Sequence, residues 1–377
     1  RRKWHALTTS LANHTNSCFL LRIGVKKTLK MGVFLFISSW INSQVYLSKF
    51  IQLTHRQEYH RKSFMLINSG LIFVGLILLY YGGDFLVTGS LRLARASKTS
   101  PFIIGATVIG FGTSTPELAV SVMASLHDSG DLALGNIIGS NIANIGLVLG
   151  ITALIVPLTI EKQRFADESP PLIITSLIIV VFSWNNYLSM IEGFIMVSLL
   201  VVYLWRAFRT KENIDTSLEE NHLLSKYKGT TFQIFLVILG IAMLIIGANW
   251  IVEGSTGIAR ELGVSEWFIG VSIVALGTSL PELTSSLIAA KRGHGEMAIG
   301  NVFGSNIFNI LMVIGTASLI KPLSIREEIY TDLIYATTLT CLLLLLIRMG
   351  HVINKRDGLI LSVCYGSYIG LKGTGLL

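Results

Sequence analysis

The sequence predicts an all-α polytopic membrane protein with ten transmembrane helices, arranged as two inverted repeats of five helices. Three observations lead to this fold class: an apolar composition, long apolar runs, and motifs that recur 165 residues apart. Of the 377 residues, 51% are hydrophobic and only 14% are charged, and the mean hydropathy is +0.64. Runs long enough to cross a hydrocarbon core of about 30 Å recur throughout the chain. This composition excludes an ordinary soluble protein.

The net charge of +8 belongs to an N-terminal extension, residues 1–64. This extension contains eleven Lys or Arg and a single acid, Glu58, whereas the remaining 313 residues contain 19 Lys or Arg and 21 Asp or Glu. The basic excess therefore gives no reason to expect nucleic-acid binding. The composition of the extension resembles a transit segment. The alternative, which we favour, is that translation starts at Met65, where "MLINSGLIFVGLILLYYGG" opens as a membrane span.

From Met65 onward the chain repeats itself. "GTSTPEL" (112–118) and "GTSLPEL" (277–283) are 165 residues apart, and 11 of 18 positions are identical between 133–150 and 298–315, at the same offset. The chain is therefore a tandem duplication. We divide it into the first repeat (65–208), a linker (209–230) and the second repeat (231–377).

Each repeat contains five apolar runs, which we interpret as spans. They are 66–91, 101–126, 133–157, 171–184 and 187–206 in the first repeat, and 231–259, 266–290, 297–320, 330–347 and 357–371 in the second. An odd number of spans per repeat makes the second copy enter the membrane upside down.

The charges of the loops agree with this inversion. Arg92, Arg95 and Lys98 follow the first span, whereas its counterpart in the second repeat is followed by Arg260 together with Glu261 and Glu266. If the linker is cytoplasmic, 15 of the 19 Lys and Arg residues after Met65 lie inside and four lie outside, as the positive-inside rule expects.

The repeated "GTSxPE" motif places a proline and a carboxylate in the middle of an apolar span. Pro116 and Pro281 interrupt the helices and release carbonyl groups, and Glu117 and Glu282 follow them directly. Together with the Thr-Ser pairs, these groups form a cluster of oxygen ligands, which hard cations such as Ca²⁺ prefer. Two carboxylates match the charge of one divalent ion or two monovalent ions. Asp84 and Glu253 do not occupy equivalent positions, so we expect no functional role for them.

The second repeated motif, "GNxxGSNIxN", supplies the opposite wall of this cluster. Its glycines form faces that allow close helix approach. Asn136, Ser140 and Asn144 are spaced at i, i+4 and i+8 on one helical face, and their counterparts are Asn301, Ser305 and Asn309. Amides and hydroxyls add coordinating oxygens without adding charge.

These paired motifs resemble the α-repeats of the cation/calcium exchanger superfamily, and specifically its sodium/calcium exchanger branch. The resemblance covers residues 65–375 and includes both motifs in both repeats. It implies that Glu117 and Glu282 are the central ligands, shared between Ca²⁺ and Na⁺. The other implied ligands are the hydroxyl or carbonyl groups of Thr113, Thr278, Ser114 and Ser279, the backbones of Gly110 and Ala275, Ser140 and Ser305 at flanking Na⁺ sites, and Asn144 and Asn309 near the centre.

The resemblance further implies a secondary antiporter that exchanges Ca²⁺ for Na⁺ by alternating access. A Ca²⁺/H⁺ antiporter that uses the same carboxylates is the alternative, and a passive cation channel is less favoured. Some members carry Asp at the position of Asn309, including potassium-dependent ones, so the neutral Asn disfavours K⁺ co-transport. We expect no enzyme activity, because no nucleophile–base set or nucleotide motif is present, and Cys18, Cys341 and Cys364 have no ligand spacing.

The expected partners are the two transported ions and the lipid bilayer. We expect no cofactor, no nucleic acid and no obligate protein partner. We expect a bacterial plasma membrane location, or an organellar one if residues 1–64 are a transit segment.

Overall fold

The computed structural model describes residues 63–127, 129–209, 229–264, 273 and 275–374. The chain divides into two units, Arg1–Phe64 and Met65–Leu377. Both sequence repeats lie within the second unit, where they pack against one another rather than forming separate domains. Nearly all of the N-terminal extension and of the linker falls outside the described residues.

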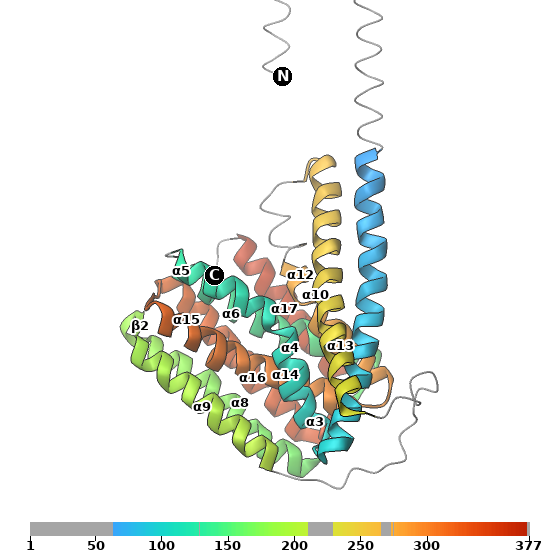
Figure 1. Ribbon diagram of the computed structural model, residues 1–377. Coiled ribbons are helices and arrows are strands. Elements are labelled where there is room, and N and C mark those ends of the chain that lie inside the picture. Colours follow the sequence, from blue (N-terminus) through green and yellow to red (C-terminus); the bar gives the residue numbers. More distant parts are fainter. Residues whose placement is uncertain (1–62, 128, 210–228, 265–272, 274, 375–377) are drawn as a thin grey trace, which may run out of the picture. The chain divides into compact units, whose positions relative to one another are not determined.

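The first repeat consists of five helical stretches (Figure 1, blue to green). The first is the long helix Ser63–Ser97. The second comprises α3 (Pro101–Ile104), the π-helix η1 (Gly105–Ile109), α4 (Gly110–Thr113) and α5 (Thr115–Leu126). The third comprises α6 (Gly130–Ala143), the π-helix η2 (Asn144–Leu149) and α7 (Gly150–Ile155). The last two are α8 (Lys162–Phe182), followed by the 3-10 turn η3 (Ser183–Asn185), and α9 (Met190–Arg209).

The second repeat follows the same order (Figure 1, yellow to red). Its described helices are α10 (Thr230–Glu261), α12 (Ala275–Thr278), α13 (Leu280–Lys291), α14 (Gly295–Phe308), the π-helix η5 (Asn309–Ile314), α15 (Gly315–Ile320), α16 (Glu327–Gly350) and α17 (Lys355–Thr374). The starts of α6, η2 and α7 lie 165 residues before those of α14, η5 and α15. The duplication found in the sequence is therefore also present in the helix boundaries.

The helices have the length and composition of membrane spans. Among the described residues, seven single helices qualify, and the bent pair Pro101–Thr113 and Thr115–Leu126 adds an eighth. Large apolar side chains such as Phe73, Ile191 and Phe194 are exposed on them, as expected where helices face lipid. Of the other two predicted spans, 266–290 is only partly described, and 357–371 is helical within α17 but is less apolar. The chain is therefore a helical multi-pass membrane protein.

The helix α8 begins at Lys162, so the predicted start of the fourth span at residue 171 was wrong. Pro170 and Pro171 lie inside this helix and do not end it. The polar run that precedes them stays helical because its charges pair within the protein. Arg164 and Glu168 are 4% and 6% exposed and form an ion pair of 3.9 Å one turn apart.

Two short antiparallel strand pairs, which the sequence did not predict, link the two repeats. In one, β1 (Leu158–Thr159) pairs with β4 (Val352–Ile353), and in the other β2 (Tyr187–Leu188) pairs with β3 (Leu323–Ser324). The pairing of Leu158 with Ile353 is the repeat equivalent of the pairing of Leu323 with Leu188. Each repeat therefore makes the same backbone contacts with the other.

Glycines allow the closest helix contacts between the repeats. A Cβ atom at Gly193 of α9 would lie 2.7 Å from the carbonyl oxygen of Gly315 in α15. A Cβ atom at the equivalent Gly358 of α17 would likewise lie 2.7 Å from the carbonyl oxygen of Gly150 in α7. Side chains larger than hydrogen do not fit between these backbones.

The first helix of each repeat packs against the other. A Cβ atom at Gly82 would lie 2.9 Å from Leu244 N in α10, and one at Gly247 would lie 2.8 Å from Gly75 O. An ion pair also joins the Ser63–Ser97 helix to the end of α13, because Arg292 donates to Asp84 and, over 2.7 Å, to Thr88 Oγ1. Asp84 thus has a structural partner in the second repeat.

Candidate cation site

The second span of each repeat breaks immediately before its glutamate. The two helix axes of the first break, α4 and α5 with their neighbours, differ by 46°. Ser114 leaves helical geometry with ψ of 2°, and the equivalent Ser279 has ψ of 0°. The break therefore lies at the serine, and each proline occupies the first turn of the following helix, where its missing N–H removes no helical hydrogen bond. The sequence predicted the break at the proline, but in the structure it lies two residues earlier, at the serine.

Glu117 and Glu282 lie in the first turns of α5 and α13 and are almost fully buried, at 3% and 1% exposed. The two carboxylates are close enough to interact electrostatically. In each, the Oε2 atom is buried without a hydrogen-bond partner among the described residues. A buried, unpartnered carboxylate oxygen is costly unless a cation or proton binds it. These two atoms therefore mark the centre of the candidate site.

Neutral oxygens of both repeats meet where α4 packs on α14. Thr113 Oγ1 lies 3.5 Å from Ser305 Oγ and 3.5 Å from Asn301 Oδ1. Ser305 Oγ also donates to the Gly110 carbonyl over 3.5 Å, and all four residues are buried. The Gly110 carbonyl additionally accepts from Ser114 N at 3.0 Å. As a cation ligand, this carbonyl would therefore have to share its oxygen with existing hydrogen bonds.

The equivalent side of the site is arranged differently. Asn136, Ser140, Thr278 and Ser279 line a cavity of about 160 Å³, together with Gly135, Gly139, Ala143, Tyr365, Tyr368 and Ile369. Ser140 thus lines a cavity, whereas its counterpart Ser305 is 0% exposed and its hydroxyl lies 3.5 Å from Thr113 Oγ1. The linings of the two sides also differ in size, because the position of Ala143, which borders this cavity, is occupied by Phe308 in the second repeat.

Ala275 is the first residue of α12, and its backbone is helical. Residues 265–272 and 274, which precede it, lie outside the described residues. Ser114 Oγ is fully buried without a hydrogen-bond partner among the described residues, so this hydroxyl is available as a ligand.

Four asparagine amides connect the third spans of the two repeats. Asn144 and Asn309 are the first residues of η2 and η5, and both are 1% exposed. Asn144 Nδ2 donates to Asn306 Oδ1 over 3.1 Å, and Asn309 Nδ2 donates to Asn141 Oδ1 over 2.9 Å. Asn141 and Asn306 were not among the site residues predicted from the sequence. Their place in the repeated "GSNIxN" motif was the available signal.

The donor set consists of oxygen atoms alone. Two carboxylates supply two negative charges, and hydroxyl, amide and carbonyl groups supply neutral oxygens. Among the described residues, no group of three or more His, Cys, Asp or Glu side chains gathers, so nothing there resembles a zinc site. Hard cations such as Ca²⁺ and Na⁺ fit this chemistry.

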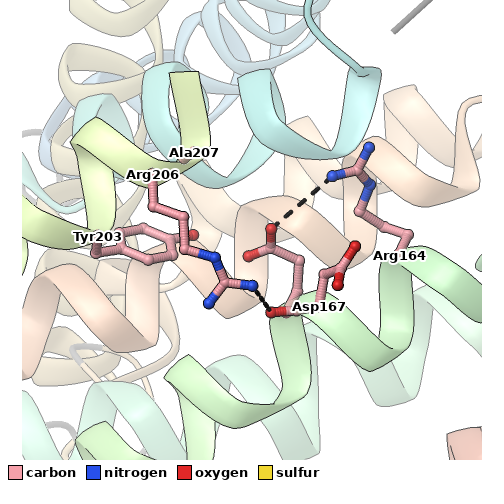
Figure 2. A pocket seen from close by; sticks show the side chains of 6 residues that line it. Arg164, Asp167, Tyr203, Arg206 and Ala207 are labelled. Carbon is pink, nitrogen blue, oxygen red and sulfur yellow. Dashed lines mark hydrogen bonds and ion pairs between the residues drawn. The ribbon is translucent and has the colours of Figure 1, made fainter. Parts of the chain in front are cut away.

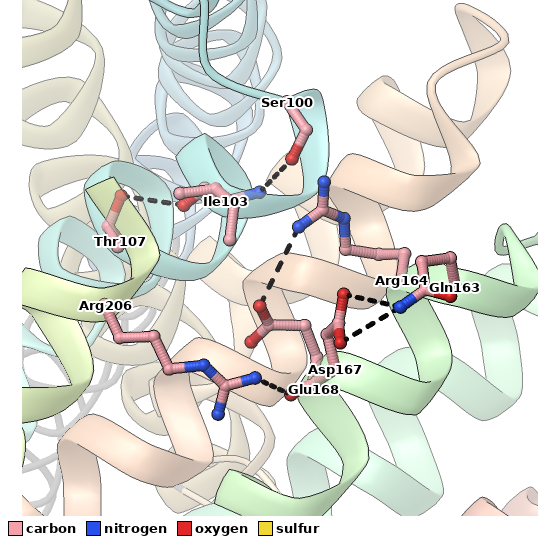
Figure 3. A network of polar contacts seen from close by, with 8 residues as sticks. All are labelled: Ser100, Ile103, Thr107, Gln163, Arg164, Asp167, Glu168 and Arg206. Carbon is pink, nitrogen blue, oxygen red and sulfur yellow. Dashed lines mark hydrogen bonds and ion pairs between the residues drawn. The ribbon is translucent and has the colours of Figure 1, made fainter. Parts of the chain in front are cut away.

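A second polar region lies between α8 and α9 and, unlike the candidate cation site, contains arginines as well as acids (Figure 2). Its cavity of about 150 Å³ is lined by Arg164, Asp167, Glu168, Tyr203, Arg206 and Ala207. Here cations and acids already pair: Arg206 Nη2 donates to the Asp167 carbonyl over 2.8 Å (Figure 3). In the second repeat, Asp332 accepts from Tyr368 at 3.1 Å and pairs with Lys372 at 2.9 Å. These clusters join helix ends, and they contain both signs of charge, unlike the cation site.

Comparisons with known proteins give a consistent result. The family model described as "Sodium/calcium exchanger protein" matches residues 67–209 and again residues 232–373. The putative antiporter CaxA of Alkalimonas amylolytica is 37% identical over 316 residues, which cover 81% of this chain and 98% of the relative. The sodium/calcium exchanger MaX1 of Methanosarcina acetivorans is 31% identical over 341 residues, with coverage of 80% and 97%. A solved structure of the sodium-calcium exchanger NCX_Mj, soaked with Na⁺ and Sr²⁺, is 35% identical with a TM-score of 0.71, covering 81% of this chain and 98% of that one.

Proposed function

Because the chain belongs to the sodium/calcium exchanger protein family, we propose that it is a secondary antiporter that exchanges Ca²⁺ for Na⁺. The observation that carries the proposal is the pair of buried glutamates, each with an oxygen atom that lacks a hydrogen-bond partner. One Ca²⁺ neutralises both carboxylates, and so do two Na⁺ ions. The same cluster can therefore hold one Ca²⁺ or two Na⁺ ions, but one Ca²⁺ together with two Na⁺ would exceed the negative charge of the two carboxylates.

In this proposal the ten spans form two inverted repeats, with the site at the membrane midplane. The odd number of spans per repeat and the signs of the loop charges support the inversion. The repeat-equivalent strand pairs and glycine contacts also support a two-fold relation between the repeats.

The difference between the two sides of the site supports alternating access. The Thr113–Ser305 side is packed, whereas the Thr278–Ser140 side borders a cavity. With a cytoplasmic linker, that cavity lies toward the outside, and Arg292, which pairs with Asp84, lies toward the inside. A shift of the Ser63–Ser97 helix and α10 would close one side and open the other. A partly filled site leaves a buried uncompensated charge, which opposes the shift and enforces exchange.

We propose a carrier rather than an enzyme, with Ca²⁺ and Na⁺ as its only substrates and with no cofactor or obligate protein partner. The bacterial and archaeal relatives support a plasma membrane location. The neutral Asn309 supports operation without K⁺.

Uptake of ⁴⁵Ca²⁺ into proteoliposomes tests this function. We expect an outward Na⁺ gradient to drive uptake, without a requirement for K⁺. Uptake driven by a pH gradient, and none by Na⁺, would make the protein a Ca²⁺/H⁺ antiporter. Ca²⁺ flux down its own gradient that needs no counter-ion and does not saturate with Ca²⁺ concentration would indicate a channel.

Charge-neutralising variants test the site itself. Glu117→Gln and Glu282→Gln each remove one of the two negative charges, so we expect Ca²⁺ transport to fall below about 1% of the parent rate, since a change of roughly 3 kcal/mol or more in ion binding is involved. Glu161→Gln is the matched control, because Glu161 is exposed. Full Ca²⁺ transport by either site variant would refute the assignment.

A further inference from the structure

The four asparagines that connect the two repeats form a hydrogen-bonded group with a defined direction, which we call the amide clasp (Asn141, Asn144, Asn306 and Asn309). Asn141 Nδ2 donates to the Asn306 carbonyl over 3.3 Å, and Asn306 Nδ2 donates to the Asn141 carbonyl over 3.4 Å. The two residues occupy equivalent positions in the two repeats, and the side chain of each donates to the backbone carbonyl of the other.

This reciprocal contact determines which way the first two amides face. A backbone carbonyl can only accept a hydrogen bond. Asn141 and Asn306 must therefore turn their NH₂ groups toward these carbonyls, and each must turn its Oδ1 atom away. The direction is set by the backbone and cannot reverse without leaving a buried carbonyl facing an oxygen.

The direction is passed on to the second pair of amides. Because Asn141 Oδ1 can only accept, Asn309 presents its NH₂ group to it, at 2.9 Å. Asn144 likewise presents its NH₂ group to Asn306 Oδ1, at 3.1 Å. Both amides must then turn their own oxygens the other way. Asn309 Oδ1 is accordingly buried without a hydrogen-bond partner among the described residues.

The released oxygens lie on the elements that contact the acidic helices. η5, which Asn309 begins, packs on α5, which carries Glu117. η2, which Asn144 begins, packs on α13, which carries Glu282. Each repeat therefore supplies an oriented amide on an element that packs against the helix carrying a buried carboxylate of the other repeat.

We propose that Asn141 and Asn306 are positioning residues, which determine that Asn309 and Asn144 face the transported cation with oxygen rather than with NH₂. An amide that turned its NH₂ group inward would place the positive end of its dipole against the cation, so the orientation of the amide affects cation affinity directly. Asn141 acts on Asn309, and Asn306 acts on Asn144. This inference rests on the proposed function, because it requires a cation between the carboxylates.

The test is equilibrium ⁴⁵Ca²⁺ binding to purified full-length protein in Na⁺-free buffer, with Na⁺ competition as a second measurement. Asn141→Leu keeps the volume of the side chain but removes its hydrogen bonds. We expect it to weaken Ca²⁺ binding about 3- to 10-fold, the range that corresponds to one buried amide hydrogen bond.

A double-mutant cycle separates positioning from packing. Asn309→Asp replaces the amide with a group that presents oxygen in either orientation. In that background Asn141→Leu should change Ca²⁺ affinity by less than about 2-fold, because no orientation remains to be lost. In the Asn144→Asp background the loss should remain about 3- to 10-fold, because Asn144 is oriented by Asn306. The mirrored cycle, Asn306→Leu in the Asn144→Asp and Asn309→Asp backgrounds, should give the reverse pattern.

Ser318→Ala, in the equivalent span of the second repeat, is the control for the loss of a buried hydrogen bond. Ser318 Oγ donates to Ile314 O over 2.8 Å, and alanine occupies the equivalent position, Ala153. We expect parent Ca²⁺ affinity. If Asn141→Leu does not yield monodisperse protein, Asn141→Ala, which leaves room for water, replaces it in the same cycle.

An equal loss in all backgrounds, or no loss in any, would overturn the positioning role. Absence of Ca²⁺ binding by the parent protein would instead refute the proposed function, so the two failures are distinguishable.

Discussion

Replacing Gly358 with alanine tests how closely α17 must approach α7. A Cβ atom at this position would lie 2.7 Å from the Gly150 carbonyl oxygen and 2.9 Å from Leu154 N. Both are backbone atoms of one helix, so neither can move without shifting that helix. Relief of the overlap would move α17, and with it Tyr365 and Tyr368, which line the cavity beside Ser140.

The magnitude follows from two opposing terms. Alanine stabilises a helix by about 1 kcal/mol relative to glycine, whereas overpacking of a close contact costs about 1–3 kcal/mol. Gly366→Ala on the same helix isolates the first term, because none of the described residues lies within 4 Å of a Cβ atom there. The equivalent residue in the first repeat is Val201, which already carries a side chain. We therefore expect Gly358→Ala to be less stable than Gly366→Ala by about 1–3 kcal/mol.

The measurement is the thermal unfolding midpoint of both purified variants in the same detergent, followed by tryptophan fluorescence and by the monodisperse fraction after heating. Gly193→Ala provides a repeat of the experiment, because its Cβ atom would lie 2.7 Å from Gly315 O, and it should shift in the same direction. Equal midpoints for Gly358→Ala and Gly366→Ala would show that α17 and α7 can separate freely, and the packing argument would fail.

Three further predictions concern polar contacts of residues that are not among the proposed cation ligands. Arg292→Gln should lower the unfolding free energy by about 1 kcal/mol, because a partly buried Asp84 loses its charged partner; an unchanged thermal midpoint would show that the pair contributes nothing. Burial and the neighbouring arginines lower the pKa of His294 to about 4, from 6.5. The unfolded chain therefore takes up a proton between pH 6.5 and 4 that the folded protein does not, and stability falls as the pH falls through this window. His294→Gln should lose less stability than the parent between pH 7 and pH 4.5. Parallel curves of thermal midpoint against pH for the two proteins would contradict this. Tyr368→Phe removes the hydrogen bond to Asp332 and should lower stability by about 0.5–1.5 kcal/mol in the same thermal assay, whereas a neutral effect would mean that water replaces the hydroxyl.

Much of the candidate site could be predicted from the sequence, because its chemistry is written in short repeated motifs. A buried carboxylate at Glu117 is unusual enough in an apolar span to indicate a ligand by itself, and its recurrence at Glu282 excludes coincidence. The two structure-derived features that agree with this reasoning are the burial of both acids and their unpartnered oxygens.

Other features could not be predicted because they depend on contacts distant in sequence. The apolar run of the fourth span begins at residue 171, but the helix begins at Lys162, since Arg164 and Glu168 find internal partners. The pairing of Leu158 with Ile353 depends on the two repeats meeting at their edges. Neither the charge pattern nor hydropathy contains information about such partners.

Composition, repeat offset and short motifs are local properties of the chain, and they are enough to identify a duplicated membrane protein of the sodium/calcium exchanger family with two acids inside apolar spans. The orientation of the asparagine amides in the candidate site, by contrast, is established only by the fold. The direction of the Asn309 amide depends on Asn141, whose own direction depends on a backbone carbonyl of the other repeat. A hydrogen bond has a donor and an acceptor, and the direction of each amide is therefore set by neighbours that only folding brings together.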